Sequence, residues 1–267
     1  KCEGVTEMAE RKTVIIDAGH GGANPGAVYM GRQEKDDALR LALAVGNLLE
    51  QSGVNVLYTR VNDVFDTPLE KAQMGNQSGA DYFISIHRNA MPIPGSASGA
   101  EVLVYEDEGV PALLAENISR NLTEAGFADL GVKERPGLIV LRRTQMPAVL
   151  VEAGFIDNPE DNRFFDDNFE NIAKAIANGV LETIRQQQMA RPEYYQVQVG
   201  AYRDRVPADR LLKELESRGL PAFIVNDDGY YKVRVGAFLN MDNAANMERI
   251  LRNMGYPTLM VREQAVY

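Results

Sequence analysis

Short apolar segments alternate with stretches of helical periodicity along the first 188 residues, and this alternation strongly restricts the possible folds. Thr13–Asp17 is predicted to be a buried strand, and "EKDDALRLALAVGNLLEQSG" is predicted to be an amphipathic helix that ends at Gly53. Strands that alternate with helices pair mostly in parallel and carry the helices on their faces. We therefore predict an α/β unit with a mostly parallel sheet flanked by helices. The other predicted strands are "VNVLYTR", "YFISIH", "AEVLVY", "LIVL" and "PAVLVE", with further helices from about Thr67, over Pro111–Ala125 and over Asn168–Gln188.

The C-terminal part of the chain contains an internal repeat. "YQVQVGAY" at 195–202 and "YKVRVGAF" at 231–238 share one pattern, and each is followed by a helical stretch and a short strand. Two such units predict a small, RNP-like α+β domain of βαββαβ order, whose four-stranded sheet carries both helices on one face. The segment "RQQQMARPE" is polar and contains a proline, so we place a linker at 189–193. The predicted domains are 12–188 and 194–263.

Charge and composition exclude several classes of protein. The formal net charge of −10 disfavours broad nucleic-acid binding, because a phosphate backbone attracts an excess of Lys and Arg. No stretch approaches the roughly 18 to 20 consecutive apolar residues that a membrane span needs. The first residues contain no signal-peptide core and the chain begins with Lys, so a leader is not visible in this sequence. The single cysteine, Cys2, cannot form an internal disulfide, and its lipidation is left open.

The chain has only two histidines, and both follow predicted strands. Alone, His20 could be satisfied by local hydrogen bonds, and the glycine turn after it lacks the lysine of a phosphate-binding loop. However, His87 and Glu152 also come at strand ends, which a parallel sheet gathers at one edge, and Glu34 starts the first helix. Two histidines and one glutamate suit Zn²⁺ with an open position for water, and the other glutamate can act as general base. Taken singly, each glutamate is better explained by structure, Glu34 as an acid in the first turn of a helix and Glu152 as a capping or structural acid.

Five segments of the first unit resemble a known family. They are "IDAGHGGANPGAVYMGRQEKD", "YTRVND", "ADYFISIHRNA", "GAEVLVY" and "VLRRTQMPAVLVEAGFIDNPED". In this order they are similar to the zinc-dependent N-acetylmuramoyl-L-alanine amidases of bacterial cell walls, the Amidase_3 family. The resemblance implies that His20, Glu34 and His87 bind one Zn²⁺ and that Glu152 is the catalytic residue. It also implies hydrolysis of the amide between N-acetylmuramic acid and the L-alanine of the stem peptide in peptidoglycan.

Three features set this chain apart within that resemblance. Arg88 stands where the family usually has a small residue, and it is expected either to contact an acidic stem peptide or to face solvent. Lys71 stands where the family usually has an arginine and is expected to be a structural variation. The segment between His87 and Gly99 is too short for the regulatory helix that some relatives place over the zinc, so we expect an open site.

Residues 194–262 resemble a SPOR domain, a module that binds peptidoglycan glycan strands stripped of their stem peptides. The resemblance is carried by "YYQVQVGAYRDRVPADRLLKELESRGLPAFIV" and "GYYKVRVGAFLNMDNAANMERILRNMGYPTLMV". Strand alternation predicts one core face and one wet face on its sheet. RNA binding is disfavoured because the residues from Glu193 onward contain ten basic and ten acidic side chains. An ordinary solvated face is the alternative to glycan binding. The candidate glycan-binding residues on the wet face are Gln196, Gln198, Tyr202, Lys232, Arg234 and Phe238.

The leading hypothesis is therefore a two-domain peptidoglycan hydrolase that contacts both peptide-bearing and denuded glycan. We expect it in the cell wall, outside the cell or in the periplasm, with the septum as one candidate location. A binding-only protein with an inactive amidase fold is the first alternative, which the presence of all four site residues disfavours. A zinc amidase of another peptide-like polymer is the second, and the predicted glycan-binding module disfavours it.

Overall fold

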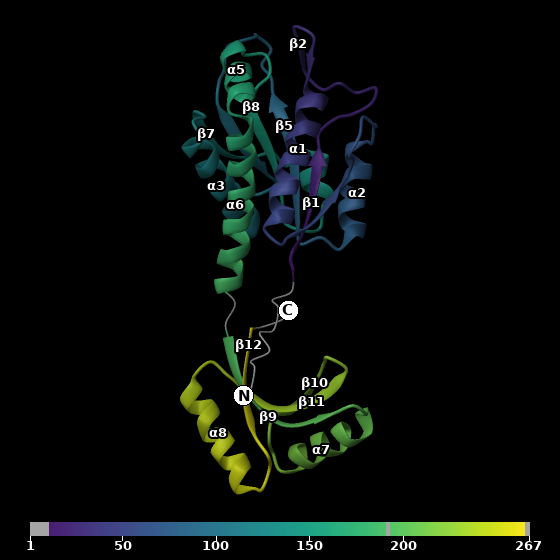
Figure 1. The fold of residues 1–267 in the computed structure, drawn as a ribbon, viewed down its shortest axis with the longest axis vertical. Helices are drawn as coiled ribbons and strands as arrows, with labels where there is room; N and C mark the ends of the chain where they lie inside the picture. Colours follow the sequence, from purple (N-terminus) through teal and green to yellow (C-terminus); the bar gives the residue numbers. More distant parts are fainter. Residues whose placement is uncertain (1–10, 191–192, 265–267) are drawn as a thin grey trace. The chain divides into compact units, whose positions relative to one another are not determined.

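The structure, a computed structural model, describes residues 11–190 and 193–264. Its contacts divide the chain into two compact units, with the division between Gln186 and Gln187 (Figure 1). Cys2 and residues 191–192 of the predicted linker lie outside the described residues. Each unit is described by itself below.

The first unit is built on a six-stranded sheet in the order β4-β1-β5-β8-β6-β7. The strands β4, β1, β5 and β8 run parallel, β6 is antiparallel to β8, and β7 is parallel to β6. This agrees with the predicted mostly parallel sheet. The strand bounds are β1 Thr13–Ala18, β4 Asn55–Tyr58, β5 Tyr82–Asn89, β6 Ala100–Val104, β7 Asp129–Glu134 and β8 Ala148–Phe155.

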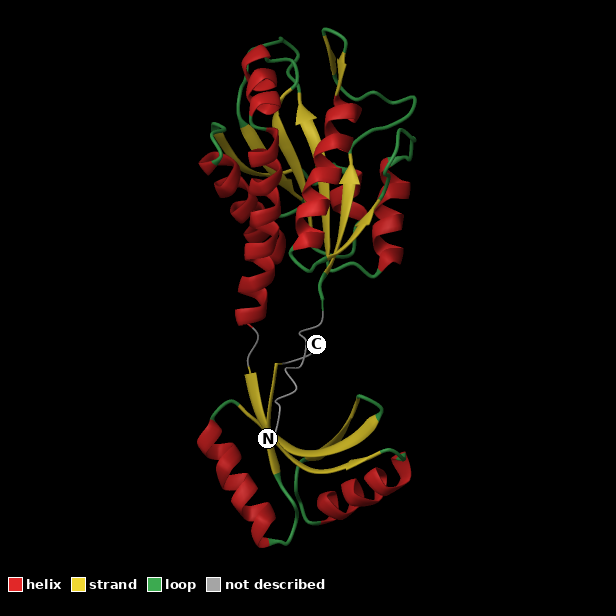
Figure 2. Cartoon of the chain, in the orientation of Figure 1, coloured by secondary structure: helices red, strands yellow, loops and turns green. Residues whose placement is uncertain are grey.

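Three long helices cover one face of this sheet. They are α1 (Glu34–Gln51), α3 (Gly109–Glu124) and α6 (Phe169–Ala190), and Figures 1 and 2 show α1 and α6 lying along the strands. Their apolar stripes pack on every second residue of the strands, for example Val14 and Ile16 of β1, in one large buried cluster. Burial of this apolar surface is the main stabilising contribution to the unit.

The other face of the sheet is only partly covered. A smaller buried cluster joins Ile15, Phe83 and Leu150 of the strands to the short helix α4 (Ile139–Arg143). The helix α2 (Pro68–Ser78) packs beside α4 and begins with a capping box in which Thr67 and Glu70 satisfy each other's backbone N–H groups. The rest of this face carries polar side chains and is left open, and the candidate site lies there.

The sequence missed some local structure. The predicted strand "LIVL" is wrong, because these residues lie at and within helix α4. A short apolar run has no periodicity long enough to separate a strand from a buried helical turn. The hairpin of β2 (Val28–Tyr29) and β3 (Arg32–Gln33), the edge strand β7 and the helix α5 (Pro159–Asp167) were not predicted.

The second unit has the predicted βαββαβ order. Its four strands pair in the order β10-β11-β9-β12, all antiparallel, and both helices pack on one face around Val197, Val199, Val233 and Val235 (Figure 2). Alternation of these valines with polar residues explains why only one face is apolar. The bounds are β9 Glu193–Tyr202, α7 Arg205–Ser217, β10 Ala222–Asp227, β11 Tyr230–Phe238, α8 Met241–Asn253 and β12 Leu259–Gln264.

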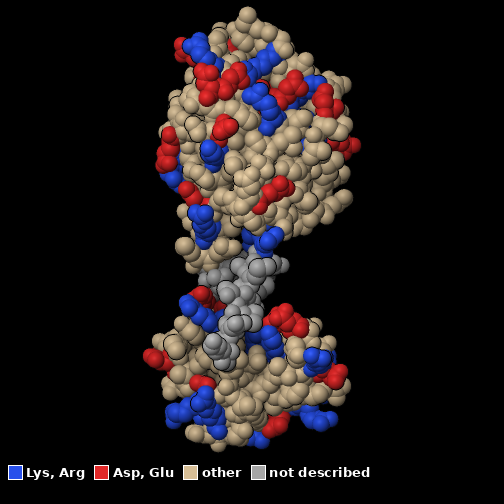
Figure 3. Space-filling view, in the orientation of Figure 1, with Lys and Arg blue, Asp and Glu red and all other residues tan. Residues whose placement is uncertain are grey.

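Charged side chains of both signs are interspersed on the face of each unit shown in Figure 3. Within the described part of the chain, no helix combines the length and apolar character that a bilayer crossing requires.

Candidate metal centre

His20 lies in the loop that follows β1, and glycines make room for it. Its backbone is left-handed, with φ of 59°, a conformation in which histidine is enriched among the non-glycine residues. A Cβ atom at Gly19 would lie only 2.4 Å from the ring of His87. A Cβ atom at Gly26 would lie 2.5 Å from Glu34 Oε2. The two glycines therefore allow the backbone to pass directly against the side chains of His87 and Glu34.

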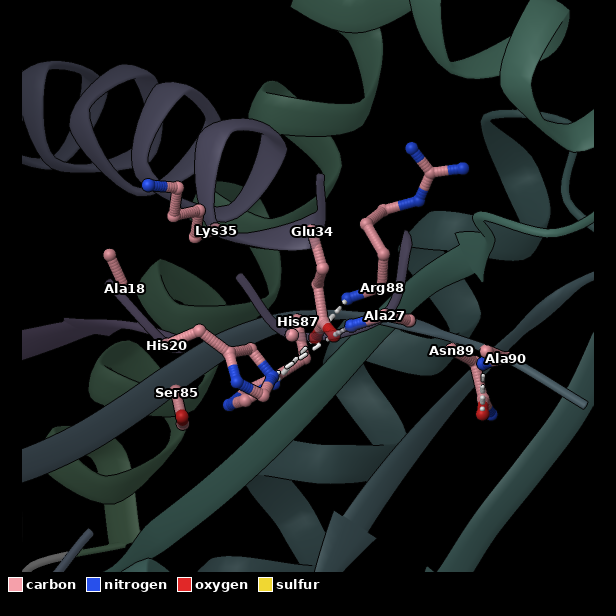
Figure 4. Close-up of polar contacts among 12 residues, drawn as sticks. Ala18, His20, Ala27, Glu34, Lys35, Ser85, His87, Arg88, Asn89 and Ala90 are labelled. Carbon is pink, nitrogen blue, oxygen red and sulfur yellow. Dashed lines mark hydrogen bonds and ion pairs between the residues drawn. The ribbon is translucent and has the colours of Figure 1, made fainter. Parts of the chain in front are cut away.

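His20, Glu34 and His87 meet at one point, although 67 positions of sequence separate the first from the last. Glu34 Oε2 lies 3.0 Å from His20 Nε2, and Glu34 Oε1 lies 2.8 Å from His87 Nδ1 (Figure 4). Each residue offers one atom that could bind a metal, and these three atoms all lie within 4.8 Å of one another. The backbone N–H of Ala27, 2.9 Å from Glu34 Oε2, also holds the carboxylate in place.

The electrostatics of this cluster favour a negative carboxylate. Burial alone would raise the pKa of Glu34, but hydrogen bonds and attraction from the two histidines hold its pKa far below the usual range. Burial would lower the pKa of His87, but the hydrogen bond to Glu34 raises it. The same three residues could hold a divalent cation, whose charge would stabilise the carboxylate in place of the imidazole protons.

The second ring nitrogen of His20 is also engaged. Its Nδ1 lies 3.1 Å from Asn24 Oδ1, and the same amide oxygen accepts a hydrogen bond from the Gly26 N–H at 3.0 Å. Nε2 is therefore the nitrogen that faces the cluster, while Asn24 fixes the orientation of the ring. Asp17, which lies near His20 in the sequence, bonds to Thr59, Lys71 and Ser85 instead.

Glu152 lies beside the cluster on the neighbouring strand. It is the register partner of His87 across β5 and β8, so both side chains project from the same face of the sheet. Its strand continues to Phe155, beyond the end that the sequence suggested. Among the described residues, the buried Oε2 of Glu152 has no hydrogen-bond partner. Burial, reinforced by the charges of Glu34 and Glu101, raises the pKa of Glu152 to about 7.

A row of polar side chains, Asn89, Glu101 and Lys133, continues from Glu152 across the sheet and was not predicted from the sequence. Glu101 of β6 is the register partner of Glu152, forms an ion pair with Lys133 of β7, and accepts a hydrogen bond from Asn89 Nδ2 at 2.8 Å. These residues line a cavity of about 720 Å³ together with both histidines, Glu34 and Glu152. Glu101 could have been recognised from the sequence, because it is an acid inside the apolar stretch "AEVLVY" and a charge in a buried strand needs a partner.

Arg88 does not take either role expected of it. Its guanidinium is buried and points away from the two histidines (Figure 4). Nη1 lies 2.7 Å from Asp37 Oδ2, and the guanidinium stacks 4.1 Å from the ring centroid of Phe165. Arg88 therefore fixes the first turn of α1 against the sheet, rather than contacting substrate or solvent. Lys71 is likewise buried, with Nζ 2.8 Å from Asp17 Oδ1.

The predicted wet face of the second unit is only partly correct. Valines 197 and 233 point to the helices, so Gln196, Gln198, Lys232 and Arg234 alternate to the opposite face. Gln196 and Arg234 are nevertheless buried, at 9% and 2% exposed, and hydrogen-bonded to each other, so the prediction that they face solvent is wrong. Tyr202 is an error, because it packs against the core. The cause is an irregularity in β9, where Val233 pairs with Gly200 but Arg234 pairs with Gln198. A second register shift pairs Phe238 with Tyr195, on the same face as Val197, so Phe238 also leaves the predicted face.

An α/β sheet whose open face gathers two histidines and a glutamate beside a carboxylate with one buried oxygen that no described residue contacts defines a hydrolase with a candidate metal centre. The chain belongs to the N-acetylmuramoyl-L-alanine amidase family, whose Amidase_3 model matches residues 14–182. It also carries a SPOR domain, matched at residues 192–262.

Similar proteins agree with this assignment. A sporulation-specific N-acetylmuramoyl-L-alanine amidase of Bacillus subtilis is 35% identical over 221 residues, which cover 80% of this chain and 85% of the relative. An endolysin of Bacillus phage SPP1 is 36% identical over 65% of this chain and 66% of its own length. The crystal structure of an N-acetylmuramoyl-L-alanine amidase from Clostridium difficile 630 matches with a TM-score of 0.63 and 30% identity, covering 67% of this chain and 100% of that chain.

Proposed function

We propose that this protein is a zinc-dependent amidase that separates stem peptides from the glycan of peptidoglycan. The bond cut would be the amide between the lactyl group of N-acetylmuramic acid and the L-alanine of the stem. One observation carries the proposal: His20, Glu34 and His87 converge next to Glu152, whose buried carboxylate oxygen has no partner among the described residues. A buried acid without a partner is costly and is typical of a group kept for chemistry.

The donor set fits zinc. Two imidazole nitrogens and one carboxylate oxygen, from His20, His87 and Glu34, are the three protein ligands typical of catalytic zinc sites. Bound there, the ion would supply a Lewis acid with one position open for water or the substrate carbonyl. The hydrogen bond from His20 to Asn24 would hold the ligand ring in the orientation that presents Nε2.

Glu152 is the proposed general base. Its carboxylate would take one proton from the attacking water as the new carbon–oxygen bond forms at the amide carbon. It would then give that proton to the departing nitrogen as the carbon–nitrogen bond breaks, so that the peptide leaves with a free amine. Its strand register with His87 keeps base and ligand on one face. The burial that raises its pKa makes it a stronger base than an exposed glutamate.

The SPOR domain is proposed to place the enzyme on glycan. We assign catalysis to residues 12–188 and glycan binding to 194–263, joined by a linker at 189–193. Gln198 and Lys232 lie on the sheet face opposite the helices, where they could contact sugar hydroxyls, whereas Gln196 and Arg234 on the same face are buried and hydrogen-bonded to each other. A tethered binder raises the local concentration of the catalytic unit at its polymer without altering the site. The expected location is the cell wall or periplasm.

The test combines metal analysis with product identification. We expect about one zinc per chain, loss of activity on chelation, and its return on adding zinc. Mass spectrometry of defined peptidoglycan after digestion should show intact glycan fragments with free lactyl groups and peptides beginning with free L-alanine. Cleavage at a glycosidic or peptide bond would overturn the proposed reaction. Full activity in protein shown to contain no metal would overturn the proposed role of zinc.

A further inference from the structure

Arg60 is a buried cation that no carboxylate contacts. It follows strand β4 and is only 3% exposed. Across residues 11–190 and 193–264, no carboxylate forms an ion pair with it. Burial lowers the pKa of the guanidinium, because removal from water disfavours its charged form. Such a group must be compensated by other hydrogen bonds, and the positions of its acceptors indicate what it does.

The hydrogen bonds that Arg60 donates to the described residues all go to main-chain carbonyls. They run from Nε to Ala18 at 3.0 Å, from Nη1 to Asn62 at 3.1 Å, and from Nη2 to both Gly19 and Lys35 at 2.8 Å. Gly19 precedes His20 in the sequence, and Lys35 follows Glu34. One nitrogen atom therefore joins the backbone beside one proposed metal ligand to the backbone beside another.

Lys71, on helix α2, is a second buried cation that holds the same loop. Its Nζ donates to the carbonyls of Ala18 at 2.5 Å and His20 at 3.3 Å, in addition to its ion pair with Asp17. The carbonyls of three consecutive residues, 18–20, thus accept hydrogen bonds from Arg60 or Lys71. In the part of the chain that the structure describes, no backbone N–H donates to the carbonyl of residue 19 or 20. The two cations supply the hydrogen bonds that secondary structure does not supply there.

The backbone held in this way is unfavourable by itself. His20, Gly21 and Gly22 have φ of 59°, 134° and 53°, which is a region that residues with a side chain rarely adopt. The turn also lies directly against the guanidinium, because a Cβ atom at Gly21 would be 3.1 Å from Arg60 Nε. Without its donors, this turn would have no fixed conformation, and His20 Nε2 would not be held 3.0 Å from Glu34 Oε2.

We infer that Arg60 and Lys71 are positioning residues of the metal centre, which hold the carbonyls next to His20 and Glu34 so that both ligands are in place before a metal binds. This inference rests on the proposed function. Neither cation is a ligand, so each acts through the backbone alone. Ligands that are already in place do not lose conformational freedom when the metal binds, so the two cations are expected to contribute to metal affinity as well as to stability.

Arg60→Lys is the first test, with zinc affinity measured by competition with a chelator. Lysine keeps the charge but has one nitrogen instead of a planar fork, so it cannot reach the carbonyls of Gly19 and Lys35 together with that of Ala18. We expect zinc affinity to fall about tenfold, as for the loss of other groups that hold metal ligands in place. The visible spectrum of the cobalt(II)-loaded protein should also change, because it depends on the positions of the ligands.

A second variant covers the case in which Arg60→Lys does not fold. Asp17→Asn/Lys71→Met removes the lysine without leaving the Asp17 charge buried and unpaired. It should also weaken zinc binding and alter the cobalt spectrum, because the carbonyls of Ala18 and His20 lose their Lys71 donor.

A matched control separates positioning from stability. Asn117 of α3 is buried, at 6% exposed, and donates to Thr183 Oγ1 of α6 at 3.0 Å, in a part of the unit that lines neither hollow beside the histidines. Asn117→Ala should lower the unfolding midpoint but keep the zinc affinity and the cobalt spectrum of the wild type. A purely structural role of Arg60 would give the same result as this control.

The outcomes separate this inference from the proposed function. Wild-type zinc affinity with a wild-type cobalt spectrum, in folded Arg60→Lys or in Asp17→Asn/Lys71→Met, would overturn the inference and leave the proposed function intact. A loss of zinc affinity in Asn117→Ala as large as that in Arg60→Lys would overturn it as well. A wild-type protein that binds no zinc would overturn the proposed role of zinc, and the inference with it.

Discussion

His87 and Glu152 are register partners on the adjacent parallel strands β5 and β8, so a candidate metal ligand and a candidate base project side by side from one sheet face. Both strands are buried on their other face by the large apolar cluster. The relative position of the two groups is therefore set by backbone hydrogen bonds and core packing rather than by a loop. Such rigidity is what a site needs when a proton must move over a fixed short distance.

Glu152→Gln should abolish most activity while leaving the fold and the metal in place. The amide keeps the size of the side chain but cannot accept the proton, so kcat should fall by about 10² to 10⁴. Zinc content and the unfolding midpoint measured by circular dichroism should match the wild type, because Glu152 is not a proposed ligand. Glu170→Gln, at an exposed position of α6, serves as the control and should remain active. Wild-type turnover in Glu152→Gln would exclude the residue as base.

The sequence allowed the α/β order, the βαββαβ repeat and the convergence of His20 with His87 to be predicted, because strand periodicity and sheet topology are local or general properties. The burial and contacts of the Arg88 side chain could not be predicted, since its partner Asp37 and the ring of Phe165 come from distant segments. The side of the sheet on which Tyr202 and Phe238 lie could not be predicted either. One irregular residue in a strand reverses the alternation, and nothing in the pattern of side chains marks it.

The buried pair of Arg88 and Asp37 should contribute to stability rather than catalysis. Arg88→Met leaves the Asp37 carboxylate buried with fewer partners and should reduce the free energy of unfolding by about 3 to 5 kcal/mol. Adding Asp37→Leu should recover part of that loss, while Arg32 keeps its other partner, Asp166. Urea unfolding of the four proteins in this double-mutant cycle measures the coupling. Additive losses from the two single changes would show that the pair is not coupled.

Asn24→Ala should weaken metal binding without removing a ligand. The hydrogen bond from His20 Nδ1 to Asn24 fixes the ring, and loss of such a partner typically costs about 10- to 100-fold in metal affinity. Competition with a zinc chelator measures the affinity directly. Asn55→Ala, at an exposed site on β4, is the matched control. If both variants hold zinc equally well, Asn24 does not orient the ligand.

The pair of Asp17 and Lys71 should make the metal-free protein sensitive to acid. Burial would raise the pKa of Asp17, but the charge and hydrogen bond of Lys71, with the Ser85 hydroxyl, hold its pKa below the usual value. A lowered pKa in the folded state stabilises the protein above about pH 3.9, the value in the unfolded chain, and the contribution is lost as the pH falls toward the folded value. Asp17→Asn/Lys71→Met should therefore lose less stability than the wild type between pH 5 and pH 3. Parallel stability curves for the two proteins would contradict this.

Removal of residues 191–267 should leave hydrolysis of soluble substrate intact but weaken retention of the enzyme on glycan. The first unit has its own core and its own candidate centre, so the truncated protein should hydrolyse soluble muropeptides at close to the wild-type rate. Retention on sacculi already treated with an amidase should fall by about tenfold or more, because the tether no longer supplies a second binding event. Gln198→Ala/Lys232→Ala in the full chain tests the sheet face itself and should reduce retention in the same direction. Tyr202→Phe changes a residue that packs on the helix side and should bind as the wild type does. Equal retention of the truncated and full-length proteins would mean that the SPOR domain does not direct this enzyme to glycan.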